Sequence, residues 1–192
     1  MTAPSEELVD WVDEEDRVLQ VLPRRDIRRR NLLHRVTSVL VFHADGRLFV
    51  HRRTPTKDVY PGLLDVMVGG TVVSGEDYPV NACREVAEEL GVRGVPLYEL
   101  FGHRFRDDDV NNLIRVYGCL CNGPFTLQPE EVAEGFWATP TEATDLVTSG
   151  RACPDSSQGW RLYLERYRDR GFTDILQKEG LAAIECGEFG GA

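Results

Sequence analysis

The sequence lacks the features that mark membrane-embedded, secreted disulfide-rich and nucleic-acid-binding proteins. No apolar run is long enough for a membrane span or a signal-peptide core. The five cysteines are odd in number and widely spread, which does not suggest a disulfide framework. With 22 Lys and Arg against 32 Asp and Glu, the net charge is −10, so a nucleic acid is a poor partner unless the basic residues gather in one place. We therefore predict a cytoplasmic protein.

The chain also lacks an internal linker rich in Pro, Gly and Ser, and 192 residues suffice for one domain with a sizeable core. We predict a charged N-terminal extension over 1–30, one domain over 31–175 and a C-terminal tail over 176–192. Within the extension, an acidic stretch gives way to a block of arginines that begins at Arg24. This block could reach phosphate groups or an acidic partner surface, or form a solvated arm, and we leave its role unassigned.

Hydrophobic patterning predicts strands around one central helix, followed by two further helices. Val- and Leu-rich runs and turn residues predict strands over 36–42, 48–50, 63–68, 95–105, 113–121 and 135–138, of which the first two form a hairpin. One later helix covers 139–148, with Thr141 as its N-cap. The other covers 156–170, where aromatic residues at helical spacing face the core: Trp160, Tyr163 and Tyr167.

The central helix has both ends marked and one apolar face. Pro79 suits its first turn, and Gly91 suits a left-handed residue at its end. The buried face is predicted at i, i+3, i+4 and i+7 by Cys83, Val86, Ala87 and Leu90.

Three glutamates fall together on the opposite side of this helix. At about 100° per residue, Glu85, Glu88 and Glu89 form one exposed patch, and Arg84 can pair with Glu88 one turn later. Like charges this close repel one another and raise one another's pKa. Hard divalent ions with oxygen ligands would neutralise the patch, so these residues predict a metal site.

The spacing of the whole segment resembles the Nudix box, G-x5-E-x7-R-E-U-x-E-E-x-G-U, where U is apolar. Every fixed position is matched, from Gly70 through Glu76 to the run from Arg84 to Val92. The resemblance implies an α/β (α+β) fold, an α/β/α sandwich whose central mixed β-sheet is flanked by helices. It also implies Mg²⁺ or Mn²⁺ and hydrolysis of a nucleoside diphosphate linked to another moiety, X, by attack of water on phosphorus.

The family's roles carry over to matching positions. Glu88 and Glu89 correspond to the metal-ligating pair, and Glu85 is either a further ligand or the base that activates water. The carbonyl of Gly69, just before the box, is a further candidate ligand. Arg84, together with Glu76, is expected to orient the loop and helix by hydrogen bonds.

Many Nudix enzymes draw another acidic residue from a later loop. The segment 130–137 resembles the glutamate-before-tryptophan segment found there, and Glu131 is the preferred candidate, with Glu130 and Glu134 left open.

A second segment, 51–63, resembles the Nudix branch that includes type I isopentenyl-diphosphate isomerases. In that branch an R-x3-K pair, matched here by Arg53 and Lys57, contacts the substrate diphosphate. Two cations near a phosphate site are chemically reasonable. With Leu32 to Arg35 included, the likeness covers roughly 31–137.

Two rival functions share this fold. The isomerases use a cysteine where this chain has Gly69 and a histidine where it has Thr71. Of the residues that bind metal in the isomerases, this chain keeps only His34. A diphosphate-binding regulatory protein without turnover is the other rival, against which the complete box argues. We predict hydrolysis of a small, nucleotide-like diphosphate whose X group the sequence does not identify. A homodimer is expected because many relatives pair.

Overall fold

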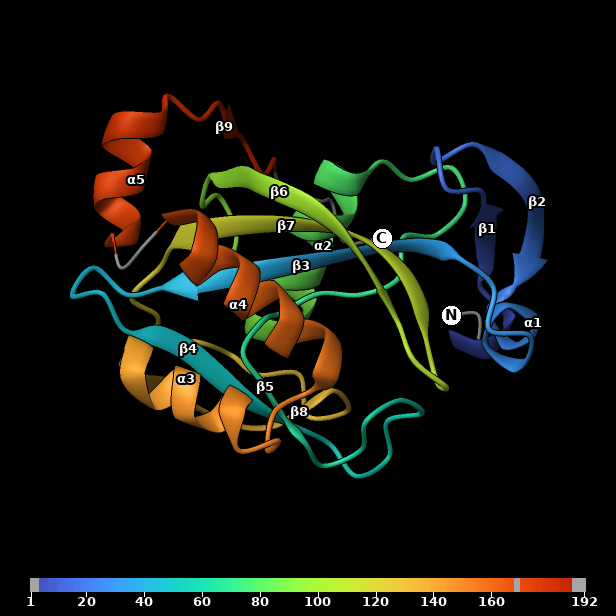
Figure 1. Cartoon of the computed structure of the whole chain (residues 1–192), viewed down its shortest axis with the longest axis horizontal. Coiled ribbons are helices and arrows are strands. Elements are labelled where there is room, and N and C mark those ends of the chain that lie inside the picture. The colour runs from blue at the N-terminus through green and yellow to red at the C-terminus, as the bar shows by residue number, and fades with distance from the viewer. Residues whose placement is uncertain (1–3, 168–169, 188–192) are drawn as a thin grey trace.

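One mixed β-sheet carries the other elements of the molecule on its two faces (Figure 1). The computed structural model describes residues 4–167 and 170–187. The strands are β1 (Leu8–Val12), β2 (Val18–Pro23), β3 (His34–Phe42), β4 (Leu48–Arg53), β5 (Leu64–Asp65), β6 (Leu97–Arg106), β7 (Asn111–Leu120), β8 (Val132–Ala138) and β9 (Ala183–Ile184). Their order is β2-β1-β3-β7-β6-β9, and β4 leaves this path to pair with β3, β5 and β8. The β3–β7 pair is parallel and the other ladders are antiparallel.

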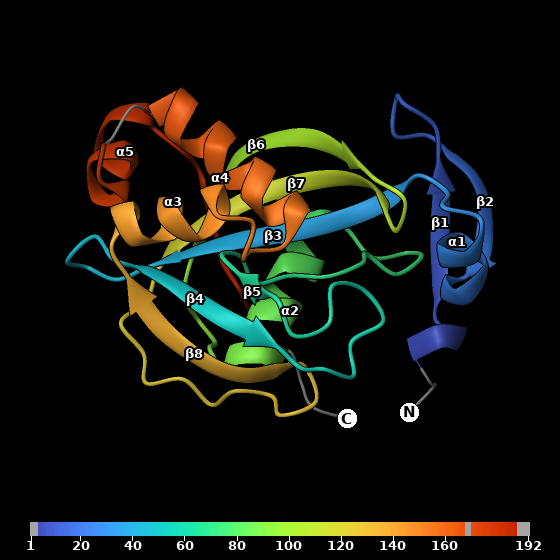
Figure 2. The same ribbon diagram turned by 60° about the horizontal axis from the view of Figure 1, so that its bottom comes forward.

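Helices cover both faces of the sheet. They are α1 (Arg24–Arg29), α2 (Tyr78–Leu90), α3 (Pro140–Thr148), α4 (Pro154–Tyr167) and α5 (Phe172–Glu179), after a short 3₁₀ turn at Pro4–Glu6. Figure 2 shows α3 and α4 on one face and α2 on the other. Because neighbouring strand residues point to opposite faces, Val39 packs with the α2 core and Leu40 with the α3–α4 core. The predicted mixed sheet flanked by helices is therefore confirmed.

Most predicted strands form, and one is cut short. The hairpin over 36–50 is confirmed by the pairing of Phe42 with Leu48. The strand predicted over 63–68 is reduced to β5, because the chain then leaves β4 and crosses to β3. There Val68 exchanges two backbone hydrogen bonds with Val39. The apolar run is buried as expected, but it is shared between two partners.

The helix that begins after β8 has a different cap from the one predicted. Thr139, not Thr141, is the N-cap of α3: its Oγ1 accepts a hydrogen bond from the Glu142 backbone N–H at 3.2 Å, and the Glu142 carboxylate accepts one from the Thr139 backbone N–H at 2.7 Å. Two threonines lie at the start of this helix, and only Thr139 as N-cap leaves Glu142 at the third helical position. In α4 the aromatic stripe is core-facing as predicted, with Trp160, Tyr163 and Tyr167 buried.

The first 30 residues contain structure that the sequence did not predict. Strands β1 and β2 form an antiparallel hairpin, and Trp11 joins it to His34 of β3. With α1 the hairpin lies at one end of the sheet (Figure 1). The domain boundaries at residues 30 and 175 stay predictions, and residues 188–192 of the predicted tail lie outside the described residues. No helix within 4–167 and 170–187 is both long and apolar enough to cross a bilayer.

One disulfide joins the C-terminal segment to α2, and the cysteine count gave no indication of it. Cys83 on α2 pairs with Cys186, which follows β9, across a sequence separation of 103 residues. Cys83 faces the core below α2, as its helical position predicted. The pairing depends on where β9 docks beside β6, which local spacing does not reveal.

Replacement of the observed cap should destabilise the protein, whereas replacement of the predicted cap should not. Thr139→Ala removes the bonds of the capping box and should lower the free energy of unfolding by about 1 kcal/mol. Thr141→Ala, a matched control on the exposed first turn, should change it by less than about 0.5 kcal/mol. Urea unfolding measures both values, and equal losses would reject Thr139 as the cap.

Candidate active site

The glutamates of the site are carried by α2, whose ends are set as predicted. Pro79 lies in the first turn, and Gly91 ends the helix with φ 67°, a left-handed conformation that glycine adopts without strain. Cys83, Val86 and Leu90 are buried against the sheet. The side chains of the box therefore start from a fixed helix.

The three carboxylates are not equally exposed, which corrects the expected solvent-facing patch. Glu88 has 49% of its side chain exposed, Glu85 has 13%, and Glu89 is only 4% exposed. The loop that follows β7 lies against the end of α2, where the Gln128 backbone N–H donates to the Glu89 backbone carbonyl at 3.0 Å. Helical periodicity cannot show a loop that packs on the helix from elsewhere in the chain.

Burial of two neighbouring carboxylates makes both hard to ionise. Burial, followed by the charge of Glu85, raises the pKa of Glu89 to about 8. Burial also raises the pKa of Glu85, against the opposing charge of Arg84. A cation placed between these two groups would favour their charged forms.

Arg84 holds the box together. Its guanidinium donates to Glu76 at 2.9 Å and to Glu88 at 2.7 Å, and it lies 2.9 Å from Glu85. The predicted Arg84–Glu88 pair is thus present. Glu76 also accepts a hydrogen bond from Asn81 at 2.8 Å, so the loop before α2 is tied to the helix at two points. This network suits the orienting role expected of Arg84 and Glu76.

Two glycines allow the loop before α2 to lie against β3 and against Glu85. A Cβ atom on Gly69 would stand 2.1 Å from the Thr37 carbonyl oxygen. A Cβ atom on Gly70 would stand 2.6 to 2.8 Å from the carboxyl group of Glu85. Both positions therefore require the absence of a side chain, and Gly70 leaves the space that the Glu85 carboxylate fills.

The later-loop candidate Glu131 reaches the cations predicted to bind diphosphate. Its carboxylate forms an ion pair with Lys57 Nζ. Glu134 instead pairs with Arg52 at 2.7 Å, and both of these side chains are largely exposed. The Glu130 carbonyl accepts a hydrogen bond from Thr54 Oγ1 at 2.9 Å, which fastens the loop. Of the three glutamates, Glu131 is the one with a carboxylate bound to a residue of the predicted site.

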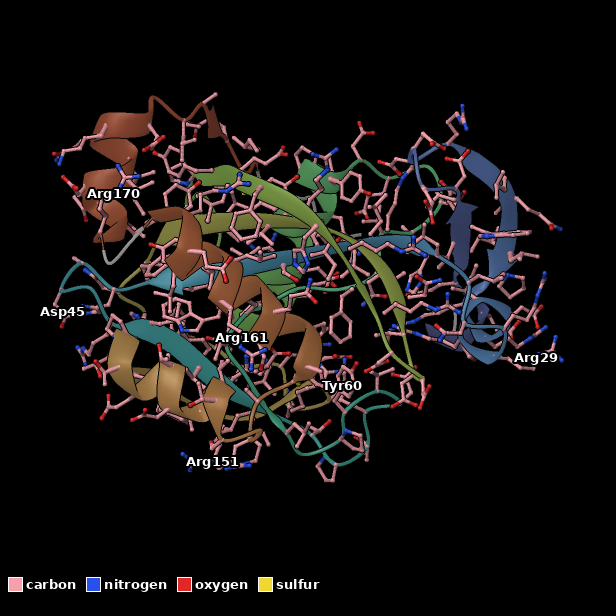
Figure 3. The ribbon with its side chains drawn as sticks, in the orientation of Figure 1. Arg29, Asp45, Tyr60, Arg151, Arg161 and Arg170 are labelled. Carbon is pink, nitrogen blue, oxygen red and sulfur yellow. A yellow bond between two sulfur atoms is a disulfide. The ribbon has the colours of Figure 1, made fainter. Side chains whose placement is uncertain are left out.

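Arg53 lies beside Lys57 in the same pocket. Its guanidinium donates to the Val59 carbonyl at 3.0 and 3.2 Å and lies 3.6 Å from the Asp65 carboxylate. Gly69 and Gly70 also line the pocket, so the predicted diphosphate contacts share a cavity with the first residue of the box, beside which the Glu85 carboxyl group lies. Tyr60 is on the loop between β4 and β5, close to the start of α4 in Figure 3.

Several charged groups in this cavity were not assigned from the sequence. Asp65 and Asp155 line it, and burial, followed by the charge of Asp65, raises the pKa of Asp155 to about 6. Arg24 and Arg28 also line it. The arginine block was visible in the sequence, but only the fold shows which of its members turn towards the cavity.

The donors fit a hard divalent cation in part. Glu85 and Glu89 offer oxygen atoms that repel one another when both are charged, which a cation would relieve. In the part of the chain that the structure describes, no three His, Cys, Asp or Glu side chains form a complete metal-binding group. Backbone carbonyl, water or substrate oxygens would have to complete the shell, an arrangement that Mg²⁺ commonly adopts.

Metal-free protein should lose stability as the pH rises from about 4.5 to about 8. In the folded protein Glu89 keeps its proton up to about pH 8, whereas in the unfolded chain it ionises near its ordinary pKa of 4.5. Between these values unfolding releases a proton, so a higher pH favours the unfolded state.

Melting temperatures in EDTA between pH 5 and pH 9 measure this effect. Glu89→Gln should flatten the decline, while Glu165→Gln, an exposed glutamate of α4, should leave it as in wild type. The same decline in Glu89→Gln and wild type would show that Glu89 does not cause it.

Comparisons with known proteins agree with this geometry. The family model for the NUDIX domain matches residues 32–155. The uncharacterized Nudix hydrolase PA4841 of Pseudomonas aeruginosa is 44% identical over 164 residues, which cover 85% of this chain and 96% of that protein. The uncharacterized Nudix hydrolase YfcD of Escherichia coli K12 is 39% identical over 162 residues, covering 84% and 89%.

A solved structure extends the similarity to three dimensions. The crystal structure of DR0079 from Deinococcus radiodurans matches with a TM-score of 0.71 and 30% identity, over 81% of this chain and 98% of that one. The family match, the sequence relatives and the shared fold lead to one conclusion: the chain belongs to the Nudix hydrolase family.

Proposed function

We propose that the protein hydrolyses a nucleoside diphosphate linked to another moiety, X, by attack of water on phosphorus, with Mg²⁺ or Mn²⁺ at Glu85 and Glu89. The observation that carries this proposal is the pair of largely buried, mutually repelling carboxylates next to a cavity that holds Arg53 and Lys57. Nudix hydrolases act on nucleoside diphosphate derivatives, and this arrangement has a place for both the cation and the diphosphate. Within the proposal the enzyme works in the cytoplasm as a homodimer.

Each side chain of the box has a separate task in this proposal. Glu85 and Glu89 hold the divalent ion, with the Gly69 carbonyl as a further ligand. When bound, the ion neutralises phosphate oxygens and lowers the pKa of water. Glu88 adds a ligand at the exposed side, while Arg84 holds Glu85 and Glu88 in place through ion pairs.

The ion pair between Lys57 and Glu131 suggests how the attacking water is activated in this proposal. A diphosphate that binds Lys57 and Arg53 competes with the carboxylate of Glu131 for the same ammonium group. The released carboxylate would then be free to orient the attacking water and accept its proton. Substrate binding and the release of Glu131 are therefore coupled in this proposal.

Isomerisation of isopentenyl diphosphate is a weaker candidate. It is favoured by the Arg53–Lys57 pair, but it requires an acid that protonates an alkene. Gly69 occupies the position of that acid, and a side chain there would clash with the Thr37 carbonyl. His34 is buried, and burial lowers its pKa to about 3, so it is neutral and is not a source of protons at neutral pH.

Loss of either buried carboxylate should abolish most turnover. Loss of a group that only supports a metal ligand commonly lowers activity by 10- to 100-fold, so Glu85→Gln and Glu89→Gln should each lower kcat by more than roughly 100-fold. Glu88→Gln should have a smaller effect because Glu88 is half exposed and paired with Arg84. Glu165→Gln on α4 is the matched control and should retain full activity.

The assay is product release from nucleoside diphosphates, nucleoside triphosphates, nucleotide sugars and isopentenyl diphosphate, with Mg²⁺ or Mn²⁺. Cleavage of one class by wild type but not by Glu89→Gln supports the proposal and names X. Isomerised isopentenyl diphosphate would instead support the second candidate. Saturable nucleotide binding without product would support a regulatory role without turnover.

Removal of Lys57 should weaken substrate binding more than metal binding. Lys57→Ala deletes a cation that the diphosphate would contact, so we expect KM to rise roughly 10-fold or more while the Mg²⁺ concentration for half-maximal rate stays constant. Lys178→Ala on α5, which removes an exposed lysine paired with Asp174, serves as the control. An unchanged KM and kcat would remove Lys57 from the substrate site.

A further inference from the structure

Two arginines of the N-terminal extension enter the cavity although they lie outside the matched family region of residues 32–155. Arg24 and Arg28 are four residues apart on α1, so they project from the same side of this helix. Ile27, which is fully buried, anchors α1 to the body of the protein. The position of both guanidinium groups is therefore set by the fold and not by a loose arm.

Arg28 is a partly buried cation whose guanidinium group has few partners. Its Nε and Nη1 atoms are buried without a hydrogen-bond partner, and Nη2 has one long contact of 3.4 Å to Thr71 Oγ1. Within the described residues no carboxylate lies at ion-pair distance from it. Burial, and then the nearby charge of Arg24, lowers the pKa of Arg28 to about 10, and Asp58 and Asp155 oppose this from a distance. A guanidinium group with two buried N–H donors that lack a partner would be stabilised by an anion.

Arg24 is partly satisfied and lies close to the diphosphate-binding cations. Its Nη1 is 3.3 Å from the Glu7 carboxylate, while its Nε is buried and unpartnered. Its charge acts on both Lys57 and Glu85, which places it within electrostatic reach of the box. Arg24 and Arg28 thus lie in the same cavity as Arg53 and Lys57, the residues predicted to contact the diphosphate.

The ion pairs among the described residues of the cavity leave Arg28 without a carboxylate partner and Arg24 with one long contact. Its lining contains four basic residues, Arg24, Arg28, Arg53 and Lys57, and three acidic residues, Asp58, Asp65 and Asp155. Arg53 lies near Asp65, Lys57 pairs with Glu131, and Arg24 lies 3.3 Å from Glu7, whereas Arg28 has no carboxylate at ion-pair distance among the described residues. The net excess is positive in a chain of net charge −10. A phosphate group suits paired guanidinium groups well because it accepts several hydrogen bonds at once.

The neighbouring arginines of α1 behave differently and provide controls. Arg25 pairs with Glu6, and Arg29 pairs with Asp26 at 2.8 Å; their side chains are 55% and 75% exposed. Figure 3 shows Arg29 at the outer edge of the molecule. Only Arg24 and Arg28 among the residues of α1 line the cavity.

We propose that Arg24 and Arg28 form a second anion subsite, which binds a phosphate group beyond the diphosphate contacted by Arg53 and Lys57. The preferred substrate would then carry at least three phosphate groups. The additional phosphate is either the terminal phosphate of a nucleoside triphosphate or a phosphate carried by X. The statement about the preferred substrate rests on the proposed hydrolysis, whereas the binding of phosphate does not.

Binding of inorganic phosphates without metal tests the subsite independently of turnover. In EDTA, calorimetry should show that wild type binds tripolyphosphate about 10-fold more tightly than pyrophosphate. Arg28→Ala should remove this preference, Arg28→Lys should restore part of it, and Arg29→Ala should retain it fully. Equal preference in Arg28→Ala and wild type would overturn the proposal.

Thermal stability separates a binding role from a packing role. If Arg28 awaits an anion, Arg28→Met should raise the melting temperature of the ligand-free protein, because it removes an unpaired buried charge and keeps the side-chain volume. Tripolyphosphate should stabilise wild type and Arg29→Ala more than Arg28→Met. A lower melting temperature for Arg28→Met together with unchanged stabilisation by tripolyphosphate would assign Arg28 to packing and reject the subsite.

Turnover identifies the source of the third phosphate. The third phosphate belongs either to nucleoside triphosphates or to nucleoside diphosphates whose X bears a phosphate. For the substrate class that provides it, Arg28→Ala should lower kcat/KM at least 10-fold in the presence of Mg²⁺, mainly through KM. Plain nucleoside diphosphates should be affected less than threefold. Equal losses on all substrates would contradict the subsite. If wild type cleaves none of them, the hydrolysis proposal fails, and the tripolyphosphate preference alone decides whether the subsite exists.

Discussion

The burial of two neighbouring carboxylates, Glu85 and Glu89, is the constraint on which the rest of the site depends. Glutamates on a helix normally remain in water, but here Glu89 is only 4% exposed and 13% of the Glu85 side chain is exposed. Arg84 offsets part of the repulsion, and Gly70 leaves the space for one carboxyl group. The protein thus keeps a charge arrangement that is unfavourable by itself and that a divalent cation would make favourable.

The sequence predicts those parts of the site that are set by local geometry. Apolar positions three and four residues apart place α2, and Gly91 ends it, because helix boundaries depend on nearby residues. The Arg84–Glu88 pair follows from the same spacing. The burial of Glu89 does not, since it depends on the tertiary structure around α2 and not on the spacing of residues within the helix. The spacing of box residues indicated the chemistry without indicating which carboxylate is exposed.

Short elements and distant pairings account for the rest of what sequence reasoning missed. A helix of six residues such as α1 is too short for a clear hydrophobic period, so its arginines had no predictable direction. Thr139 and Thr141 are equally good caps by residue type, and only the position of Glu142 separates them. The Cys83–Cys186 disulfide required knowledge of the tail's course. In each case the missing information was the packing of one segment on another.

The parallel pairing of β3 with β7 has a consequence for the order in which the molecule assembles. His34 lies opposite Asn112, so β4, β5, α2 and β6 are all contained in the chain that must close before this central ladder exists. Such long-range closure is entropically costly and slow compared with local helix formation. The helix can therefore form early with its glutamates hydrated, and they leave water only when the sheet is complete. The removal of these two carboxylates from water therefore accompanies the formation of tertiary structure and does not precede it.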